Sequence, residues 1–284
     1  MMKSGKHLQR LASLATLAAV VTLLWVIIAL CREGLMHWHW WVLWRRPREL
    51  RAGGGLGPEL INTLSMVALA ECLSLPLGLA TAIWLGDAKL PRRVRDGLDG
   101  FFISFQSIPA IVVGLVAFEV LVGYFHWPLS VATGTLALAV LNVPQVVVFS
   151  RQAMAAVPDA WREGSLALGA TALETVWRMV LPASLLALVD QLGLSFARLA
   201  GESALLIFTA GLNVGPHWGW FQPGETLAVR LWQVRTEGLM PDRAALAAET
   251  GMVLLAITAL ALVGSKVWSL RLKAYQSGPG GGGP

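Results

Sequence analysis

Long apolar runs dominate the pattern of hydrophobic and polar positions along this chain. The first run, from Leu11 to Leu30, carries no charged side chain over about 20 residues, the length that an α-helix needs to cross the hydrocarbon core of a bilayer. It is too long for the apolar core of a cleaved signal peptide, so we expect it to persist as an uncleaved membrane helix. Later runs of the same kind follow at intervals.

The apolar runs predict six membrane-spanning α-helices. We place them at residues 11–31, 60–86, 101–125, 128–150, 183–212 and 246–268. The expected fold class is an all-α, polytopic membrane protein. Its expected parts are an N-terminal helix with a basic, Trp-rich external loop (1–57), a core (58–270) and a C-terminal tail (271–284) that ends in a glycine-rich stretch.

Two polar segments separate the later helices. Residues 151–182 contain charged residues of both signs and are compatible with short helices. Residues 213–245 contain several prolines, and their middle part, 225–237, is able to form an amphipathic helix on the outer face. With six spans, these segments lie on opposite sides of the membrane.

Composition and charge support an inner-membrane location. The chain is 56% hydrophobic and 14% charged, whereas soluble domains carry about 25% charged residues. The net charge of +5 does not indicate nucleic acid, because basic residues also set topology and contact anionic membrane lipids. A cytoplasmic N-terminus puts thirteen basic residues inside and eight outside. The cluster Arg45–Arg51 opposes this orientation, and its Trp neighbours indicate a segment lying along the interface.

Several kinds of chemistry lack a pattern in this sequence. Cys31 and Cys72 have no CxxC spacing, which argues against a disulfide or metal framework. No GxxxxGK[ST] motif for ATP occurs. His37 and His39 stand among tryptophans, which is more typical of an interface anchor than of a metal site. We therefore expect no catalytic residues, no metal and no cofactor bound by this chain.

Charged residues inside the fifth predicted helix are candidates for a transport pathway, because such residues are costly in a membrane and usually functional. They are Asp190, Arg198 and Glu202. In a continuous helix, Arg198 and Glu202 share one face. Arg198 then either binds a tetrahedral oxyanion through its planar guanidinium or forms a structural ion pair with Glu202, and the residues alone do not decide between the two. Asp190 is better explained as structural.

The segment from Glu163 to Pro182 has a specific spacing. Glu163-Gly164-Ser165 is followed by three residues, Gly169, nine residues and Met179-Val180-Leu181-Pro182. This resembles the EAA-x3-G-x9-I-x-LP loop of ABC importer permeases. The resemblance implies a short helix that docks on an ATPase, with a turn at Gly169 and with Leu181 and Pro182 opening the next helix. Glu163 is expected to pair with basic residues of that ATPase.

Three further segments resemble phosphate importer permeases of the PstA type. Residues 197–210 resemble that family's ARxAGETAPLLFTA segment, residues 105–115 resemble its SxPSIVVGL segment, and residues 53–56 match its GGGL loop. The resemblance runs from about residue 53 to the end of the sixth helix. It implies a substrate pathway that uses Arg198, Glu202, Gln106 and Ser107.

The same resemblance implies the partners. They are two copies of an ATP-binding subunit, which bind ATP and magnesium, a second, PstC-like permease, a periplasmic substrate-binding protein and membrane lipids. The expected function is translocation of phosphate or a related oxyanion across the bacterial inner membrane.

One departure from that family concerns the fourth helix. After Val143-Pro144, phosphate permeases commonly carry an Arg and then a Glu, where this chain has Val148 and Arg151. The cargo is therefore phosphate, or another substrate such as sulfate, molybdate, phosphonate or an amino acid. A rearranged site that includes Asn142 and Gln145 is a further option, although Asn142 is better explained by hydrogen bonding between helices. A non-transporting signalling or scaffold subunit is the remaining alternative.

Overall fold

The computed structural model describes residues 2–47, 54–87, 90–212, 219–237 and 242–276, and within these ranges it contains helices and no strand. Five helices are long and apolar enough to cross a membrane, and a bent pair of shorter helices raises the number to six. This agrees with the predicted all-α membrane fold. The basic end of the Trp-rich loop, residues 213–218 and 238–241, and the glycine-rich tail lie outside the described residues.

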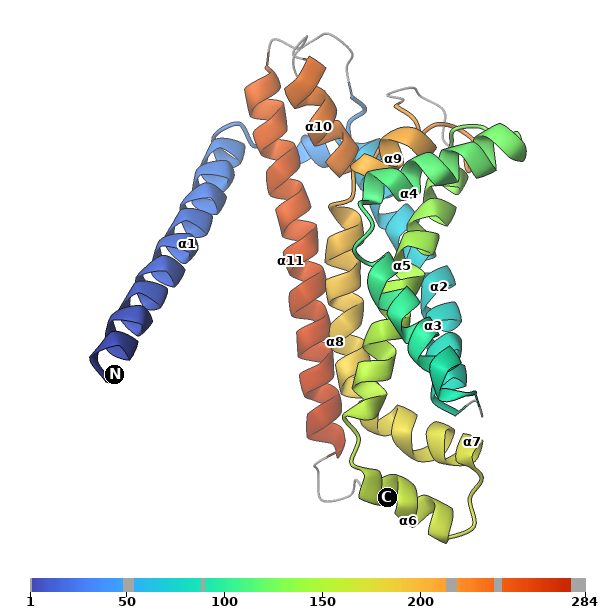
Figure 1. The fold of residues 1–284 in the computed structure, drawn as a ribbon. Coiled ribbons are helices and arrows are strands. Elements are labelled where there is room, and N and C mark those ends of the chain that lie inside the picture. The colour runs from blue at the N-terminus through green and yellow to red at the C-terminus, as the bar shows by residue number, and fades with distance from the viewer. Residues whose placement is uncertain (1, 48–53, 88–89, 213–218, 238–241, 277–284) are drawn as a thin grey trace.

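The long helices share one general direction (Figure 1). They are α1 (Met2–Met36), α2 (Gly57–Asp87), α5 (Val131–Ala155), α8 (Leu181–Ala200) and α11 (Arg243–Gln276). We call the two ends of the bundle the α6 end and the α10 end, after the short helices α6 (Asp159–Ala167) and α10 (Leu227–Glu237) that lie there.

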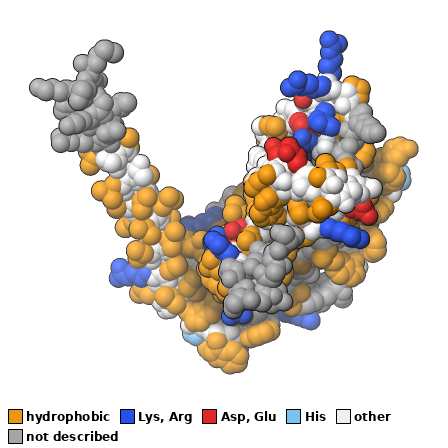
Figure 2. Space-filling view, turned by 90° about the horizontal axis from the view of Figure 1, so that it is seen from below, with side chains coloured by type: hydrophobic (Ala, Val, Ile, Leu, Met, Phe, Trp, Pro, Cys, Tyr) orange, Lys and Arg blue, Asp and Glu red, His pale blue; other side chains and the backbone are white. Residues whose placement is uncertain are grey.

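Helix α1 leans away from the other helices (Figure 1). It meets α11 near its own end, where Gly34 lies against Ala248 and Met252. Side chains 11–29 are all exposed, and most of the described part of this arm is hydrophobic (Figure 2). In water such a surface would be unstable, but the apolar arm suits a lipid environment.

The core of the bundle forms where α2, α5 and α8 pack together. The α2–α5 contact is the most extensive pairing of helices, and Gly78 of α2 lies so close to α5 that a Cβ there would come within 2.6 Å of Val146. Small residues at such crossings let helices in membranes approach closely. Met66, Leu138 and Leu199 are among the fully buried residues at this junction.

The third predicted helix, 101–125, is not continuous, because two helices form where one was predicted. The chain forms α3 (Arg92–Phe105) and α4 (Ala110–Ala117), which continues as the π-helix η2 (Phe118–Tyr124), and the two parts meet at 98°. The break lies at Pro109, which cannot donate a backbone hydrogen bond and disfavours a helical conformation in the residue before it. Gln106 and Ser107 therefore lie in the bend and not along a helix.

The fifth predicted helix also differs from the prediction of residues 183–212. It begins earlier, because α7 (Ala172–Thr175), the π-helix η3 (Val176–Val180) and α8 follow one another directly. The π-helical turn precedes Pro182, whose missing N–H such a local adjustment accommodates. The helix also ends earlier, at Ala200, and a short helix α9 (Ala204–Thr209) follows after a break.

The predicted amphipathic helix at 225–237 corresponds to α10 (Leu227–Glu237). It packs on α11 and on the beginning of α2, so one face is buried by the protein itself. A short 3₁₀ helix, η1 (Trp40–Leu43), lies at the same end with Val42 buried and Trp40 and Trp44 exposed.

We expect Gly193→Ala to destabilise the packing of α8 on α11. A Cβ at Gly193 would meet the backbone oxygen of Ala261 at 2.8 Å and the Ser265 hydroxyl at 2.0 Å, and overpacking of this kind costs about 1–3 kcal/mol. Gly264→Ala is the control, because nothing lies within 4 Å of its added Cβ. Thermal unfolding in detergent, followed by size-exclusion chromatography, should show a lower midpoint for Gly193→Ala alone. Equal midpoints for both variants would contradict the packing described.

Candidate functional site

The α6 end carries a compact helical hairpin. Helix α6 ends at Ala167, and Gly169 follows with φ +92°, a conformation that glycine adopts without strain. The chain then enters α7 through a capping box, in which the Thr171 side chain and the Glu174 side chain each accept a hydrogen bond from the other residue's backbone N–H. The turn predicted at Gly169 is therefore present, and the capping box at the start of α7 fixes the chain that follows the turn.

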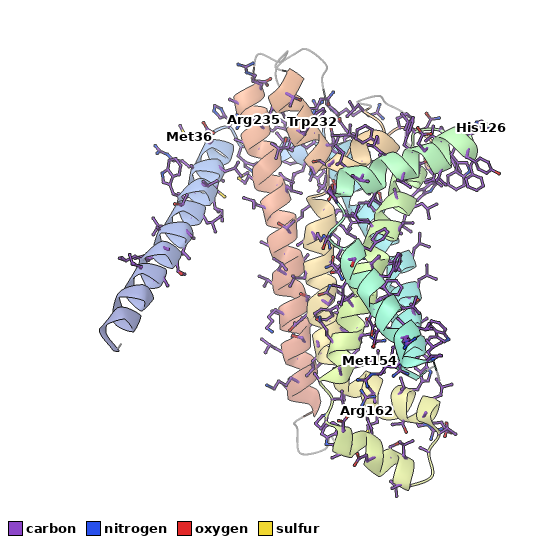
Figure 3. All side chains as sticks on the ribbon, in the orientation of Figure 1. Met36, His126, Met154, Arg162, Trp232 and Arg235 are labelled. Atoms are coloured by element: carbon purple, nitrogen blue, oxygen red, sulfur yellow. The ribbon has the colours of Figure 1, made fainter. Side chains whose placement is uncertain are left out.

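Side-chain hydrogen bonds hold α6 in place. The hydroxyls of Ser165 and Thr175 lie 2.9 Å apart and link α6 to α7. The Arg162 guanidinium donates to the backbone oxygen of Met154 at the end of α5, and both residues can be followed at the bottom of Figure 3. Because α6 is hydrogen-bonded at two points, its rotation relative to the bundle is restricted. A displacement of α6 is therefore transmitted to the bundle with little bending.

The outer surface of α6 is available for a partner. Glu163 is exposed, and Trp161 is about half exposed although it is apolar and lies at the α6 end of the bundle. Leu168 is 91% exposed. Exposed apolar side chains grouped beside charged ones are typical of a protein interface. Leu181 is half-buried and Pro182 is exposed, at the start of α8.

The four predicted pathway residues are distributed over two breaks in the helices. Gln106 lies at the end of α3, where its amide donates to the backbone oxygen of Phe102 at 3.5 Å, and Ser107 is exposed beside it. Arg198 lies in the last turn of α8 and is exposed, and Glu202 follows in the break before α9. That the two pairs line one path stays a prediction.

The ion pair that was considered between Arg198 and Glu202 is not formed among the described residues. Helix α8 ends at Ala200, so Glu202 is not one turn further along the same helix. Its carboxylate instead accepts a hydrogen bond from the backbone N–H of Leu205, at the start of α9, where a negative charge is favourable. The Arg198 guanidinium is thus left without a carboxylate partner in the described part of the chain.

The other polar residues of the membrane region hold helices together. Asn142 donates to Ser74 of α2 at 2.8 Å and accepts from Ser195 of α8 at 3.0 Å, which confirms the interpretation of Asn142 as a link between helices. Asp190 pairs with Lys266 of α11 at 2.9 Å, in agreement with a structural role. The side-chain oxygen of Gln145 is buried and has no hydrogen-bond partner among the described residues.

Sequence reasoning missed a buried charged cluster at the α10 end. Arg230 of α10 is 1% exposed and lies 3.3 Å from a carboxylate oxygen of Glu225 and 3.8 Å from one of Glu59, both equally buried. Gln233 also accepts a hydrogen bond from Arg230. The signal that was available is an Arg and a Glu five residues apart in the segment 225–237. Their burial depends on Glu59, which is distant in the sequence.

Backbone contacts reinforce this cluster. The Leu227 N–H donates to the Thr63 hydroxyl at 2.9 Å, and the Asn62 side chain donates to the Glu225 carbonyl at 3.1 Å. Asn62 and Thr63, near the beginning of α2, thus fix the start of α10. At the α10 end, the start of α10 is therefore held on α2 by a buried network of charged and polar side chains.

Comparison with known proteins decides the family. Residues 74–269 match the model of the family described as "Binding-protein-dependent transport system inner membrane component". The chain belongs to this family. It is therefore a multi-pass inner-membrane permease subunit of an ABC importer and not itself an enzyme, and ATP hydrolysis belongs to separate subunits.

The similar relatives include phosphate permeases. The chain is 31% identical over 224 residues to the probable ABC transporter permease protein YqgI of Bacillus subtilis, covering 74% of this chain and 76% of the relative. It is also 31% identical over 209 residues to the phosphate transport system permease protein PstA 2 of Mycobacterium tuberculosis, covering 73% and 68%.

Solved structures support the fold alone. An importer of the acidic polysaccharide alginate has a chain that aligns with a TM-score of 0.65 at 12% identity, covering 91% of this chain and 95% of its own. A chain of the MetNI methionine transporter aligns with a TM-score of 0.60 at 20% identity, covering 77% and 94%. One permease fold therefore serves chemically different cargoes, and the cargo has to be argued from the site.

We expect Arg230→Met to destabilise the permease strongly, because it leaves two buried carboxylates without their cation. Breaking a buried pair in this way costs about 3–5 kcal/mol. Arg235→Met on the exposed part of the same helix should change stability by less than about 0.5 kcal/mol.

The triple variant Arg230→Met, Glu59→Gln, Glu225→Gln tests the cause. Removing all the charges together should recover much of the thermal midpoint in detergent that Arg230→Met alone loses. A triple variant as unstable as the single one would show that charge burial is not the reason.

Proposed function

We propose that this permease carries phosphate or a related oxyanion across the inner membrane, and that Arg198 contacts the anion. The observation that carries the proposal is the exposed Arg198 guanidinium, which has no carboxylate partner in the described residues. A charge held inside a membrane span without a partner is costly, so its retention indicates a function. The similarity to permeases of phosphate transport systems supports the same cargo.

The position of Arg198 suits a passing anion. It lies where α8 ends, so the break at residues 201–203 adds polar backbone beside the guanidinium. Broken helices lining a cavity are a common way for membrane proteins to expose polar groups at depth. A second break, at Gln106 and Ser107 between α3 and α4, offers hydrogen-bond donors of the same kind. In this proposal the two breaks line one path.

The proposed orientation places the N-terminus and the α6 end in the cytoplasm, in line with the excess of basic residues in those segments. In this arrangement α6 docks on an ATP-binding subunit, which binds ATP and magnesium. Two copies of that subunit, a second, PstC-like permease and a periplasmic substrate-binding protein complete the transporter. The exposed face of α6, held rigidly on α5 and α7, supports this role.

Replacing Arg198 tests the proposed cargo. In the assembled transporter, Arg198→Ala should lower the uptake of labelled phosphate about 10–100-fold, because hydrogen bonds to a charged group contribute about 1.5–3 kcal/mol. Arg198→Lys should retain part of the uptake, since it keeps the charge and loses the planar fork. Arg235→Ala, an exposed arginine on α10, is the control.

The same assay distinguishes the alternatives. Labelled sulfate, molybdate and phosphonate are measured in parallel, and uptake of one of these in place of phosphate would assign a different cargo to the same scaffold. ATP hydrolysis without accumulation of any anion would favour a signalling or scaffold subunit. Phosphate uptake that survives Arg198→Ala unchanged would refute the proposed role of this residue.

The turn at Gly169 provides a separate test of coupling. Gly169→Ala places a Cβ on a residue with φ +92°, which costs about 1–3 kcal/mol and shifts α6. We expect Gly169→Ala and Glu163→Ala each to reduce substrate-stimulated ATP hydrolysis several-fold while the subunit remains in the membrane. Gly164→Ala is the control, because that Cβ meets nothing within 4 Å and lies in a helix. Undiminished transport in both test variants would refute the docking role.

A further inference from the structure

A cavity of about 230 Å³ lies behind α6, on its inner side. Its walls come from five elements at the α6 end, namely α2, α5, α6, α7 and η3, and the apolar lining residues include Ile83, Met154 and Leu166. A single water occupies about 30 Å³ in the liquid, so the cavity has room for a small polyatomic ligand. Two arginines, Arg151 and Arg162, stand among these mostly apolar walls.

Arg151 lines this cavity and has one unused donor group. One of its terminal nitrogens, Nη2, binds Asp99 of α3 at 2.9 Å. The other, Nη1, is buried and has no hydrogen-bond partner among the described residues. An unsatisfied buried donor on a charged group is costly, and the surrounding apolar walls increase that cost because they lower the local dielectric constant. Arg151 therefore carries a donor that no acceptor in the described part of the chain satisfies.

Arg162 brings the second charge from α6. Its Nη2 donates to the Met154 carbonyl, and its Nε lies 4.0 Å from Asp159, whose carboxylate is 92% exposed. That weak, solvent-exposed contact does little to neutralise the guanidinium. Arg151 of α5 and Arg162 of α6, the proposed docking helix, thus line the same cavity. Each arginine uses only part of its hydrogen-bonding capacity.

We propose that this cavity binds an oxyanion of the phosphate class between Arg151 and Arg162. Planar guanidinium groups match the paired oxygens of a phosphate, and Arg151 and Arg162 both line this cavity. The phosphate group belongs either to inorganic phosphate or to the headgroup of an anionic lipid, since both present the same oxygens at this end of the bundle. The site lies apart from Arg198 and goes beyond the proposed transport path.

A bound anion connects α5 to α6 and so holds the docking helix. Arg162 already ties α6 to Met154, and an anion shared with Arg151 adds a second, charge-assisted link across the same gap. Occupancy of the cavity therefore changes the freedom of α6 relative to the bundle. If α6 lies in the cytoplasm, as the proposed orientation has it, the cavity reports on anions of the cytoplasm or of the inner leaflet.

The test measures binding directly, on the permease assembled with its partner subunits and carrying Arg198→Ala to remove the transport path. In nanodiscs made of phosphatidylcholine alone, equilibrium dialysis with labelled inorganic phosphate should give saturable binding. Adding Arg151→Gln with Arg162→Gln should weaken that binding about 10-fold or more. Asp99→Asn should strengthen it several-fold, because it releases the Nη2 of Arg151. Arg178→Gln, an exposed arginine of η3 that does not line the cavity, should leave it unchanged.

The second arm identifies a lipid source. In phosphate-free buffer, native mass spectrometry of the same proteins in nanodiscs containing phosphatidylglycerol should show retained lipid that the double arginine variant loses and Arg178→Gln keeps. If the double arginine variant loses bound phosphate or bound lipid while Arg178→Gln keeps it, the result supports the site, and the arm that shows the loss identifies the ligand. Binding in neither arm overturns the proposal, as does an equal loss in Arg178→Gln. Neither outcome depends on whether phosphate is the transported cargo.

Discussion

Hydrocarbon offers no hydrogen bonds to a backbone, so every N–H and C=O inside the membrane has to find its partner within the protein. For this chain that constraint leads to helices, and it also makes each interruption of a helix meaningful. The interruptions at 106–109 and 201–203 occur inside predicted membrane-spanning helices. The π-helical turn before Pro182 lies just before the predicted start of the fifth such helix. Each exposes polar backbone that would be unfavourable against lipid. The candidate pathway residues Gln106, Ser107, Arg198 and Glu202 lie at or beside the two breaks.

The remaining polar groups divide into two kinds. Asn142, Ser74 and Ser195 satisfy one another between helices, and Arg230 is surrounded by the carboxylates of Glu59 and Glu225. These groups strengthen the scaffold, because removing any member leaves another unsatisfied in a medium of low dielectric constant. Arg198 and the Nη1 of Arg151 are of the second kind, with capacity that the described chain does not use. The proposals about ligands rest on the second kind.

The α6 end combines rigidity with exposure. Gly169, the Thr171–Glu174 capping box and the Ser165–Thr175 contact define the hairpin, and Arg162 joins it to α5. Its outer face presents Trp161 and Glu163. A helix that is tied to the bundle and open on one side is suited to pass a displacement from a soluble partner to α5 and α8. The cavity lies within the same arrangement, with walls from α6, α7, η3 and the ends of α2 and α5.

The sequence by itself determined the class of protein and most of its helices. Apolar runs of bilayer length predicted the spans, since the thickness of the hydrocarbon core leaves little choice, and the spacing from Glu163 to Pro182 indicated an importer subunit. The tertiary structure decided the bends, the partners and the burial. Periodicity in 101–125 does not reveal a 98° bend at Pro109, because prolines are also tolerated within membrane helices such as α2 and α5. The spacing of Arg198 and Glu202 predicted a shared face, which the end of α8 at Ala200 removes. Arg230 lies in a segment predicted to form an amphipathic helix on the outer face, and only the approach of α10 to the start of α2 buries it against Glu59. Charge pairing between distant segments depends on how the helices pack, which no local pattern encodes.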